Sequence, residues 1–415
     1  MTIAPDAAVA TGLRVSTTTE AALEERFAPI FARIARDNVE RERTRAFPYD
    51  EVTDLKDAGF GRLRIPENHG GLGASLEQTF VLLARLAEAD PNVAHVFRNH
   101  LAFVEDRLNA PASQSVRWLE RFRDGDFVGG GWTEAGNGTL ANIATRVERD
   151  GNRHRVTGAK FYATGSLYAD WLDVLGKTDD GAYLTLLVRR DDAGVTLTDD
   201  WDGFGQQTTA SGSATYEGAQ ADSSDVFDIG ERFVYQGPFY QVAILSVLTG
   251  IIRAALRDGV AALRERGRNY PQGLDPVPAR DPQLLQVIGE VSQAGFAAEA
   301  ALRHVARSLD RLAAAIADRG RDAVDDIITE AQVATDQAQA VVVRNALEAT
   351  THIFDALGSS GVSKTRLLDR HWRNARTLSS HNPVVYKSRI IGDWLVNGTD
   401  PVPRLTSSGR GGQGN

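Results

Sequence analysis

Near its C-terminus the chain reads RHWRNARTLSSHNPVVYK (370–387), a segment rich in groups that could do chemistry. His381 could donate or accept a proton, because an imidazole titrates near neutral pH. Arg373 and Arg376 could hold a phosphate, whose geometry matches a guanidinium group, or could form salt bridges with an acidic surface. The His-Asn-Pro triplet could also do no more than cap a helix. The segment therefore offers proton handling and anion binding, with a structural alternative for each.

Two further segments place a threonine at the end of a predicted strand. The first, WTEAGNGT, carries Thr133 after FVGGG, and the second, KFYATGS, carries Thr164 before a glycine. Gly and Asn are common in turns, so each segment alone could be a simple turn. Together they could form a backbone cradle whose two hydroxyl groups face a bound polar ring.

The composition excludes several kinds of site. The 415 residues contain no cysteine, which excludes disulfides, thiolate metal sites and cysteine nucleophiles. None of the 8 histidines has the HExxH type of spacing, so we expect no metal site. The net charge of −9 gives no electrostatic support for binding nucleic acid or an anionic membrane. No apolar run approaches the roughly 18 residues of a membrane span, and the N-terminus does not read as a secretory signal. We therefore expect a cytoplasmic protein.

Hydrophobic periodicity divides the chain into regions that must position these groups. We expect an N-terminal helical domain over 1–125, a middle β domain over 126–235, a C-terminal helical bundle over 236–405 and a flexible tail over 406–415. The fold class is thus α+β and mostly α. We expect a cleft where the three domains meet, because ligands often bind at such junctions.

The helical regions carry clear start and stop signals. Ser75 followed by Gln78 has the pattern of a capping box. Gly358 ends a long periodic helix, and Pro383 suits the first position of a last one. Helices are predicted near 19–37, 48–58, 75–89, 92–105, 112–123, 243–267, 282–318, 321–357 and 383–397. The last four could form a four-helix bundle.

The middle region alternates short β-branched or aromatic runs with turns. Asp150-Gly151 stands between two such runs and predicts the tip of a β-hairpin. Because no helix intervenes between these runs, we predict an antiparallel sandwich or barrel.

The order of these regions, with the stretches IPENHGGLG, WTEAGNGT, GAKFYATGS and RHWRNAR, resembles the acyl-CoA dehydrogenase superfamily over most of the chain. The resemblance implies an N-terminal helical domain, a middle antiparallel β-barrel and a C-terminal four-helix bundle, assembled as a homotetramer. It also implies that Thr133 and Thr164 hydrogen-bond to the pyrimidine edge and N5 region of a flavin.

One position departs from the dehydrogenases. They commonly carry a Tyr-Glu-Gly-Thr stretch whose glutamate removes the α-proton of an acyl-CoA, and alignment places His381 at the tyrosine and Asn382 at the glutamate. A carboxamide cannot be that base, because it does not titrate near neutral pH. The stretches SSHNPVVYK, DDWDGFGQQTTASGS, VFRNH and NGTDPVP instead resemble the flavin-dependent monooxygenases of the dibenzothiophene and dimethylsulfone branch.

The resemblance to this branch implies a role for each matching residue. His381 would hydrogen-bond to a flavin hydroperoxide or shuttle its proton, Thr164 would hold the N5 side, and His100 would face the substrate unless His95 takes that place. The implied flavin contacts are Trp132, Thr133, Thr164, Trp201, Ser211, Arg268, Arg373, Arg376 and Asn382. The family's Gly-x-Arg-x-Thr/Ser run reads GQQT here (205–208), without the arginine, which keeps FAD open beside FMN.

The implied function is that of a two-component monooxygenase. It would take reduced FMN from a separate NAD(P)H:flavin reductase, form a flavin hydroperoxide with O2, and oxygenate a small hydrophobic substrate at sulfur, aromatic carbon or amine nitrogen. The chain has no GxGxxG dinucleotide fingerprint, which agrees with a flavin reduced elsewhere. Two alternatives stay open: an FAD-dependent acyl-CoA dehydrogenase with a displaced base, and an inactive flavin-binding homologue.

Overall fold

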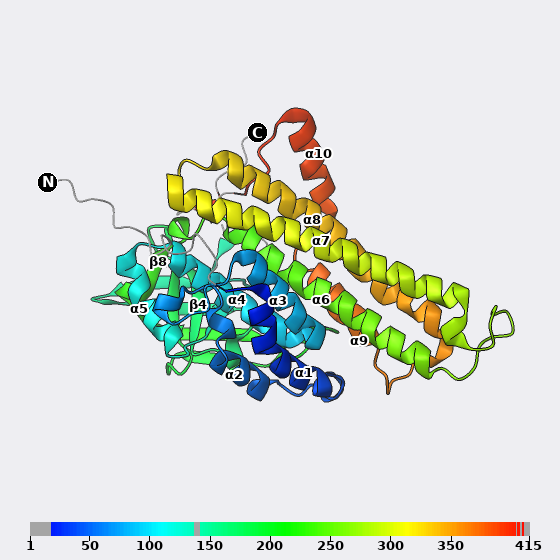
Figure 1. The fold of residues 1–415 in the computed structure, drawn as a ribbon. Helices are drawn as coiled ribbons and strands as arrows, with labels where there is room; N and C mark the ends of the chain where they lie inside the picture. Colours follow the sequence, from blue (N-terminus) through cyan, green and yellow to red (C-terminus); the bar gives the residue numbers. More distant parts are fainter. Residues whose placement is uncertain (1–17, 137–141, 404, 407–408, 411–415) are drawn as a thin grey trace.

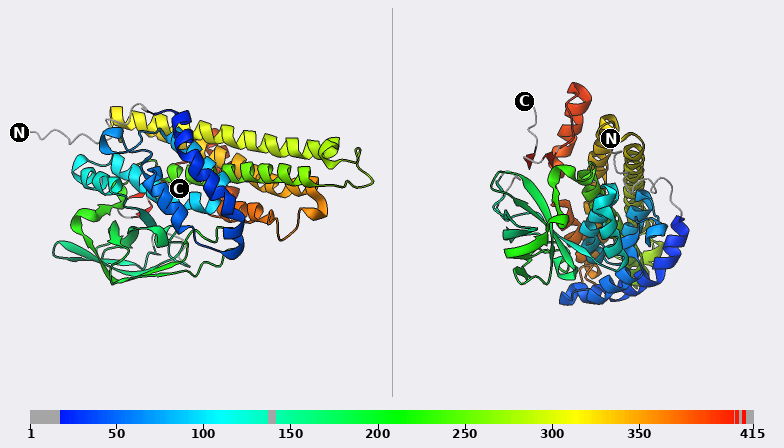
Figure 2. Two further views of the ribbon diagram at one scale, coloured as in Figure 1. Left: turned by 60° about the horizontal axis from the view of Figure 1, so that its bottom comes forward. Right: turned by 90° about the vertical axis from the view of Figure 1, so that its left-hand side faces the viewer.

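The structure, a computed structural model, describes residues 18–136, 142–403, 405–406 and 409–410. They form a helical body with an eight-stranded sheet on one side of it (Figures 1 and 2). The α+β, mostly helical fold class is confirmed. Most of the predicted tail over 406–415 lies outside the described residues, which in this part include only the short strands β9 (Leu405–Thr406) and β10 (Gly409–Arg410).

The N-terminal region is helical, as expected. Its α-helices are α1 (Glu20–Thr44), α2 (Tyr49–Asp57), α3 (Leu76–Ala89), α4 (Pro91–Asn109) and α5 (Ala112–Arg123). The predicted capping box is confirmed, because the Ser75 side chain accepts from the backbone N–H of Gln78 and the Gln78 side chain accepts in return. Asp90 caps α4, which is buried along almost its whole length. Polar groups on α4 are therefore carried into the interior of the protein.

The middle region forms most of one sheet in the order β6-β7-β3-β2-β4-β5-β8, with β1 beside β4. Its strands are β1 (Val128–Gly131), β2 (Arg146–Asp150), β3 (Arg153–Lys160), β4 (Trp171–Lys177), β5 (Tyr183–Arg189), β6 (Val195–Thr198), β7 (Ser213–Asp222) and β8 (Val226–Asp228). The hairpin between β2 and β3 is confirmed, and Gly151 at its tip has a φ of 61°, which favours glycine.

The prediction of an antiparallel sheet needs a correction. Most neighbouring strands are antiparallel, but β1 runs parallel to β4, with Val128 opposite Trp171. The chain makes the β2–β3 hairpin and a long loop before it returns alongside β1 in the same direction. The sheet is therefore mixed, and the segment before β4 crosses beside the end of β1.

The C-terminal region is built on three long helices, α6 (Gln236–Glu265), α7 (Pro282–Arg319) and α8 (Asp325–Leu357). These helices run side by side through the length of the molecule (Figure 1). The shorter α9 (Asp369–Ser379) packs against α6 and α8. Among the described helices, α6 is long and apolar enough to cross a membrane, but 78% of its apolar window is buried inside the protein, as in a core helix.

The last helix, α10 (Lys387–Asn397), begins later than predicted. Pro383 precedes a short 3-10 turn, Val384–Tyr386, and does not start the α-helix itself. α10 contacts α8 but contains no buried residue, and it projects from the body (Figure 1). The four-helix bundle thus has three long members and a fourth that lies largely outside.

Candidate active site

Helix α4 carries three polar side chains to the place where the sheet meets α6. They are His95, Arg98 and Asn99, and α4 contacts both β1 and α6. The Asn99 side-chain amide donates to the carbonyl oxygen of Thr164 at 2.8 Å. His95 lies one turn before Asn99, so the two share a face of the helix. α4 thereby links the predicted flavin threonine to a histidine.

Four predicted flavin contacts gather beside this face. The hydroxyl groups of Thr164 and Ser211 are 2.8 Å apart. The backbone N–H of Phe161 donates to the carbonyl oxygen of Thr133, which joins the end of β1 to the segment before Thr164. The Trp201 ring lies 6.4 Å from that of Phe161 and packs against the same segment. Thr133, Thr164, Trp201 and Ser211 therefore surround one place.

The loops around this place are held in unusual backbone conformations. Tyr162, Gln206 and Ala210 have φ values of 61°, 54° and 53°, although none of them is glycine. Such conformations cost free energy and gather at functional sites. Gly205 allows the loop to touch α9, because a Cβ there would lie 2.4 Å from the carbonyl oxygen of Arg373. Packing against α9 thus fixes the loop that carries Gln206.

A chain of side-chain hydrogen bonds fixes the protonation pattern of His95. Asn374 donates to the carboxylate of Glu42 at 3.4 Å, and its Oδ1 accepts from the backbone N–H of Gln206 at 2.5 Å. Its Oδ1 also accepts from the Gln206 side-chain NH2 group, so Oε1 of Gln206 faces His95 Nδ1 at 3.0 Å. The proton of neutral His95 therefore sits on Nδ1.

The other ring nitrogen of His95 faces the site. Nε2 is buried and has no hydrogen-bond partner among the described residues. Burial, aided by the positive charge of Arg98, lowers the pKa of His95 to about 3, so the ring is neutral at physiological pH. His95 thus presents a lone pair that can accept a hydrogen bond from a ligand.

His381 lies in the turn after α9, where its backbone N–H donates to Leu378 O at 3.1 Å. The residue is exposed to solvent by surface area, although the surrounding protein partly desolvates its ring. This desolvation lowers its pKa well below the ordinary value, and the nearby Arg98 and His95 lower it further. Two neutral imidazoles and a guanidinium group are therefore neighbours here.

His100, the first choice for the substrate-facing histidine, lies elsewhere. It is buried, Nε2 contacts Gly61 O at 3.1 Å, and Nδ1 accepts from Val128 N–H at 3.2 Å. Its ring also stacks on Phe127, with centroids 4.4 Å apart. Both nitrogens are engaged in holding β1 against the N-terminal helices. The structure favours the alternative, His95, for the site.

Trp132 also points away from the gathered residues. Its ring packs in a small cluster with Ile143, Tyr183 and their neighbours, and the guanidinium of Arg232 lies 5.3 Å from it. This surrounding is that of a structural residue inside the β domain.

The predicted phosphate arginines and the predicted flavin contact Asn382 are dispersed in one protomer. Arg373 binds Glu42 and Asp369, and Arg376 is exposed. Asn382 is half-buried, and its carbonyl oxygen accepts from Gln339 at 3.2 Å. Arg268 is exposed in the loop after α6. This loop lies at the end of the bundle that is remote from the sheet (Figures 1 and 2). The 30 residues of α6 span roughly 45 Å, so Arg268 cannot reach the site of its own protomer.

The sequence interpretation gave no role to four residues that shape this site: Arg98, Gln206, Asn374, and Tyr240, whose carbonyl oxygen accepts from Arg98 Nε at 3.2 Å. Arg98 lies three residues after His95, and this helical spacing was the signal that the sequence offered. Gln206 and Asn374 are ordinary amides in sequence. Their role depends on contacts between segments 168 residues apart.

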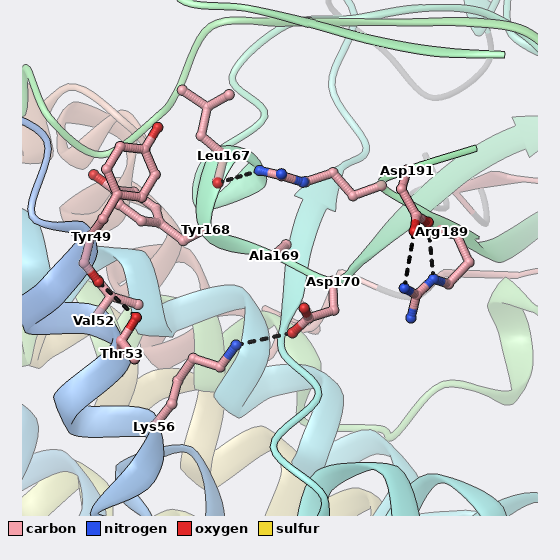
Figure 3. A pocket seen from close by; sticks show the side chains of 11 residues that line it. Tyr49, Val52, Thr53, Lys56, Leu167, Tyr168, Ala169, Asp170, Arg189 and Asp191 are labelled. Atoms are coloured by element: carbon pink, nitrogen blue, oxygen red, sulfur yellow. Dashed lines mark hydrogen bonds and ion pairs between the residues drawn. The ribbon is translucent and has the colours of Figure 1, made fainter. Parts of the chain in front are cut away.

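A pocket of about 330 Å³ opens between α2 and the segment before β4. Figure 3 shows Lys56 paired with Asp170 and Arg189 paired with Asp191 along its wall, beside the rings of Tyr49 and Tyr168. None of the predicted site residues lines this pocket. It is therefore separate from the site built around α4.

The residues at α4 fit a flavin. Paired hydroxyl groups at Thr164 and Ser211 can meet the polar edge of an isoalloxazine ring, and the Trp201 ring can pack on it. The lone pair of His95 Nε2 has no partner in the part of the chain that the structure describes. The cation of Arg98 likewise faces no carboxylate in the described parts of the chain. In the same parts, no cluster of three His, Asp or Glu side chains could hold a metal ion.

Comparisons with known proteins agree with this assignment. The acyl-CoA dehydrogenase N-terminal domain matches residues 14–126, and the acyl-CoA dehydrogenase C-terminal domain matches residues 242–386. A dibenzothiophene monooxygenase of Rhodococcus qingshengii is 26% identical over 387 residues, covering 89% of this chain and 92% of that protein.

Two further similarities concern the cofactor. A Pseudomonas putida protein named "Probable FMNH2-dependent monooxygenase SfnC" is 26% identical over 386 residues, covering 90% of this chain and 94% of its own. The crystal structure of FMN-bound TdsC from Paenibacillus sp. A11-2 superposes with a TM-score of 0.84 and 26% identity, covering 91% of this chain and 98% of TdsC.

Proposed function

The chain belongs to the acyl-CoA dehydrogenase family, and from this premise we propose that it is an FMNH2-dependent monooxygenase. One observation carries the proposal. The residue aligned with the base of the dehydrogenases is the amide Asn382, and it follows His381, which lies near Arg98 and His95. A dehydrogenase needs a carboxylate base at the reacting carbon, whereas two neutral imidazoles can donate and accept hydrogen bonds to a bound oxygen species. Similarity to two proteins named as monooxygenases supports the same reading.

Each residue at α4 then has a task. Thr164, Ser211 and Trp201 would hold and orient the isoalloxazine ring, and Thr133 would stand at its polar edge. Bound reduced FMN would supply two electrons for the reaction of O2 with the substrate. His95 Nε2 can accept a hydrogen bond, while the neutral ring of His381 can either donate or accept one. His95 and His381 thereby hold and move the proton that oxygen insertion requires.

The partners and assembly are part of the proposal. Reduced FMN would come from a separate NAD(P)H:flavin reductase, because the sequence has no dinucleotide fingerprint of its own. A homotetramer would bring Arg268 of one protomer to the flavin phosphate of another. The cysteine-free composition suits a reducing cytoplasm. The substrate would be a small hydrophobic molecule, with a sulfur compound favoured by the relative that acts on dibenzothiophene.

Stopped-flow mixing tests this function. Reduced FMN bound to the protein is mixed with O2, and a transient absorbance distinct from free flavin oxidation is expected, with faster decay when an oxidisable substrate is present. A matched anaerobic arm mixes oxidised FMN or FAD on the protein with a panel of acyl-CoAs. Bleaching of the flavin in that arm would show a dehydrogenase, and the absence of any transient in the first arm would indicate an inactive homologue.

A further inference from the structure

Arg98 is a buried cation that has no carboxylate partner among the described residues. Its residue is only 8% exposed, its Nε donates to the carbonyl oxygen of Tyr240 at 3.2 Å, and its guanidinium carbon lies 4.5 Å from the Tyr240 ring centroid. Neither contact neutralises the charge. Burial lowers the pKa of Arg98 to about 10, so it remains charged at neutral pH.

The other buried arginines behave differently. In the described ranges, each of them is within ion-pair distance of at least one carboxylate; they are Arg41, Arg64, Arg107, Arg232 and Arg370. An unpaired buried charge is costly, because the charge loses its hydration without a compensating partner. The exception at Arg98 therefore points to an anion that comes from outside the chain.

Arg98 is also placed beside the reacting groups. Its charge lowers the pKa of both His95 and His381. Within the described part of the protein, Nη1 and Nη2 donate to no protein acceptor, and neither belongs to the fully enclosed unpaired atoms. These two nitrogens form the planar end of the guanidinium group, whose geometry matches two oxygens of a carboxylate or sulfinate.

We propose that Arg98 binds an oxyanion of the substrate, so that the substrate is a small organic carboxylate or sulfinate with a hydrophobic body. The proposal rests on the proposed function, since it takes the space beside His95 and His381 as the place of reaction. It narrows the substrate class away from neutral aromatic heterocycles. The Tyr240 ring beside the guanidinium offers an apolar surface for the rest of the molecule.

The experiment compares binding of two probes that differ in charge. Benzenesulfinate and the neutral thioanisole are titrated into the protein loaded with oxidised FMN, and the perturbed flavin absorbance reports binding. Arg98→Met keeps the aliphatic stem and removes the charge, and Arg98→Lys keeps the charge and removes the fork. Arg36→Met, an exposed arginine of α1, controls for the loss of one surface charge.

We expect Arg98→Met to weaken benzenesulfinate by on the order of tenfold to one hundredfold, with thioanisole and FMN affinities unchanged. Arg98→Lys should be intermediate, and Arg36→Met should match the wild type. Equal benzenesulfinate affinity in Arg98→Met and wild type would overturn the proposal, as would failure of the wild type to bind this anion. A loss of FMN affinity instead would assign Arg98 to the flavin phosphate and also overturn it.

The outcome is separable from that of the proposed function. Arg98-dependent binding of benzenesulfinate without any transient in the stopped-flow experiment would leave Arg98 as an anion site and refute the monooxygenase. A transient without Arg98-dependent binding of benzenesulfinate would support the monooxygenase and refute the anion site at Arg98.

Discussion

His381 provides the residue-scale test of the proposed chemistry. Its neutral ring follows α9 and lies near His95, whose Nε2 can only accept a hydrogen bond. Removing the His381 imidazole takes away a ring that can both donate and accept a hydrogen bond. We expect His381→Ala to slow substrate oxygenation by about 10²–10⁴-fold, while FMN affinity stays close to that of the wild type.

Single-turnover product formation with preloaded reduced FMN measures this effect, and fluorescence titration measures FMN binding. His304→Ala, at an exposed histidine of α7, is the matched control and should react like the wild type. Wild-type product formation in His381→Ala would remove His381 from the mechanism. A parallel collapse of FMN affinity would show that the residue is structural.

His100 makes a second prediction, about stability and pH. Burial and the charge of Lys56 lower its pKa to about 3, whereas the pKa of this histidine in an unfolded chain lies near the ordinary value of 6.5. Below pH 6.5 the unfolded state therefore binds a proton that the folded state does not, so this residue lowers stability as pH falls toward 3. The contribution grows by about 1.4 kcal/mol per pH unit.

Urea unfolding of wild type and His100→Gln at pH 7, 6 and 5 measures this contribution. The variant loses hydrogen bonds at every pH, so only the pH dependence is informative. We expect its stability to fall less steeply between pH 6.5 and 5 than that of the wild type. Parallel pH dependences in the two proteins would contradict a neutral, buried His100.

At the scale of elements, the crossing of α3 and α6 depends on Gly250. A Cβ at this position would lie 2.4 Å from Ala84 O and 2.5 Å from Ala87 Cβ, and neither atom can move without moving α3. Because α4 follows α3 directly, such a shift would reach the site. We expect Gly250→Ala to destabilise the protein by about 1–3 kcal/mol.

Gly289→Ala in α7 is the control, since a Cβ there meets nothing within 4 Å. It should be neutral or stabilising by up to about 1 kcal/mol, because alanine is the better helix former. Thermal unfolding of the two variants makes the comparison. Equal melting temperatures would mean that the helices separate without cost.

The helices and strands also show which parts of the fold can be predicted from the sequence. Ser75 and Gln78, Gly151 and the long apolar periods each act through neighbours in the chain, and the structure has the cap, the hairpin and the helices that they predict. The parallel pairing of β1 with β4 was missed because it joins strands separated by a hairpin and a loop. Local sequence signals do not determine which strands that are distant in sequence pair with each other.

In the candidate site, too, the features that depend on local motifs were predicted and those that depend on distant contacts were not. Thr164 and Ser211 follow from motifs and do meet. His95 and His100 are five residues apart, so their side chains point about 140° apart around a helix. The sequence alone does not determine which of the two histidines faces the site. The tautomer of His95 depends on Asn374 and Gln206, which come together only when α9 packs against the loop.

The whole molecule leaves an apolar surface on α10 that its own chain does not cover. Leu395 is 66% and Val396 82% exposed, and no residue of this 11-residue helix is buried. A helix of this length is marginal in water by itself, so a covering partner would stabilise it. The exposed Arg268, remote from its own site, likewise favours assembly of several chains.

We therefore expect light scattering to give the mass of four chains of 45.0 kDa for the wild type. Leu395→Asp combined with Val396→Asp should reduce that mass, because two charges on the apolar face oppose its burial. If Arg268 completes a neighbouring site, FMN affinity should fall in the same variant. Val116→Asp, at a residue of α5 that is 49% exposed, should change neither quantity. An unchanged mass in the double variant would mean that α10 lies outside the interface, and a monomeric wild type would rule out sharing of Arg268.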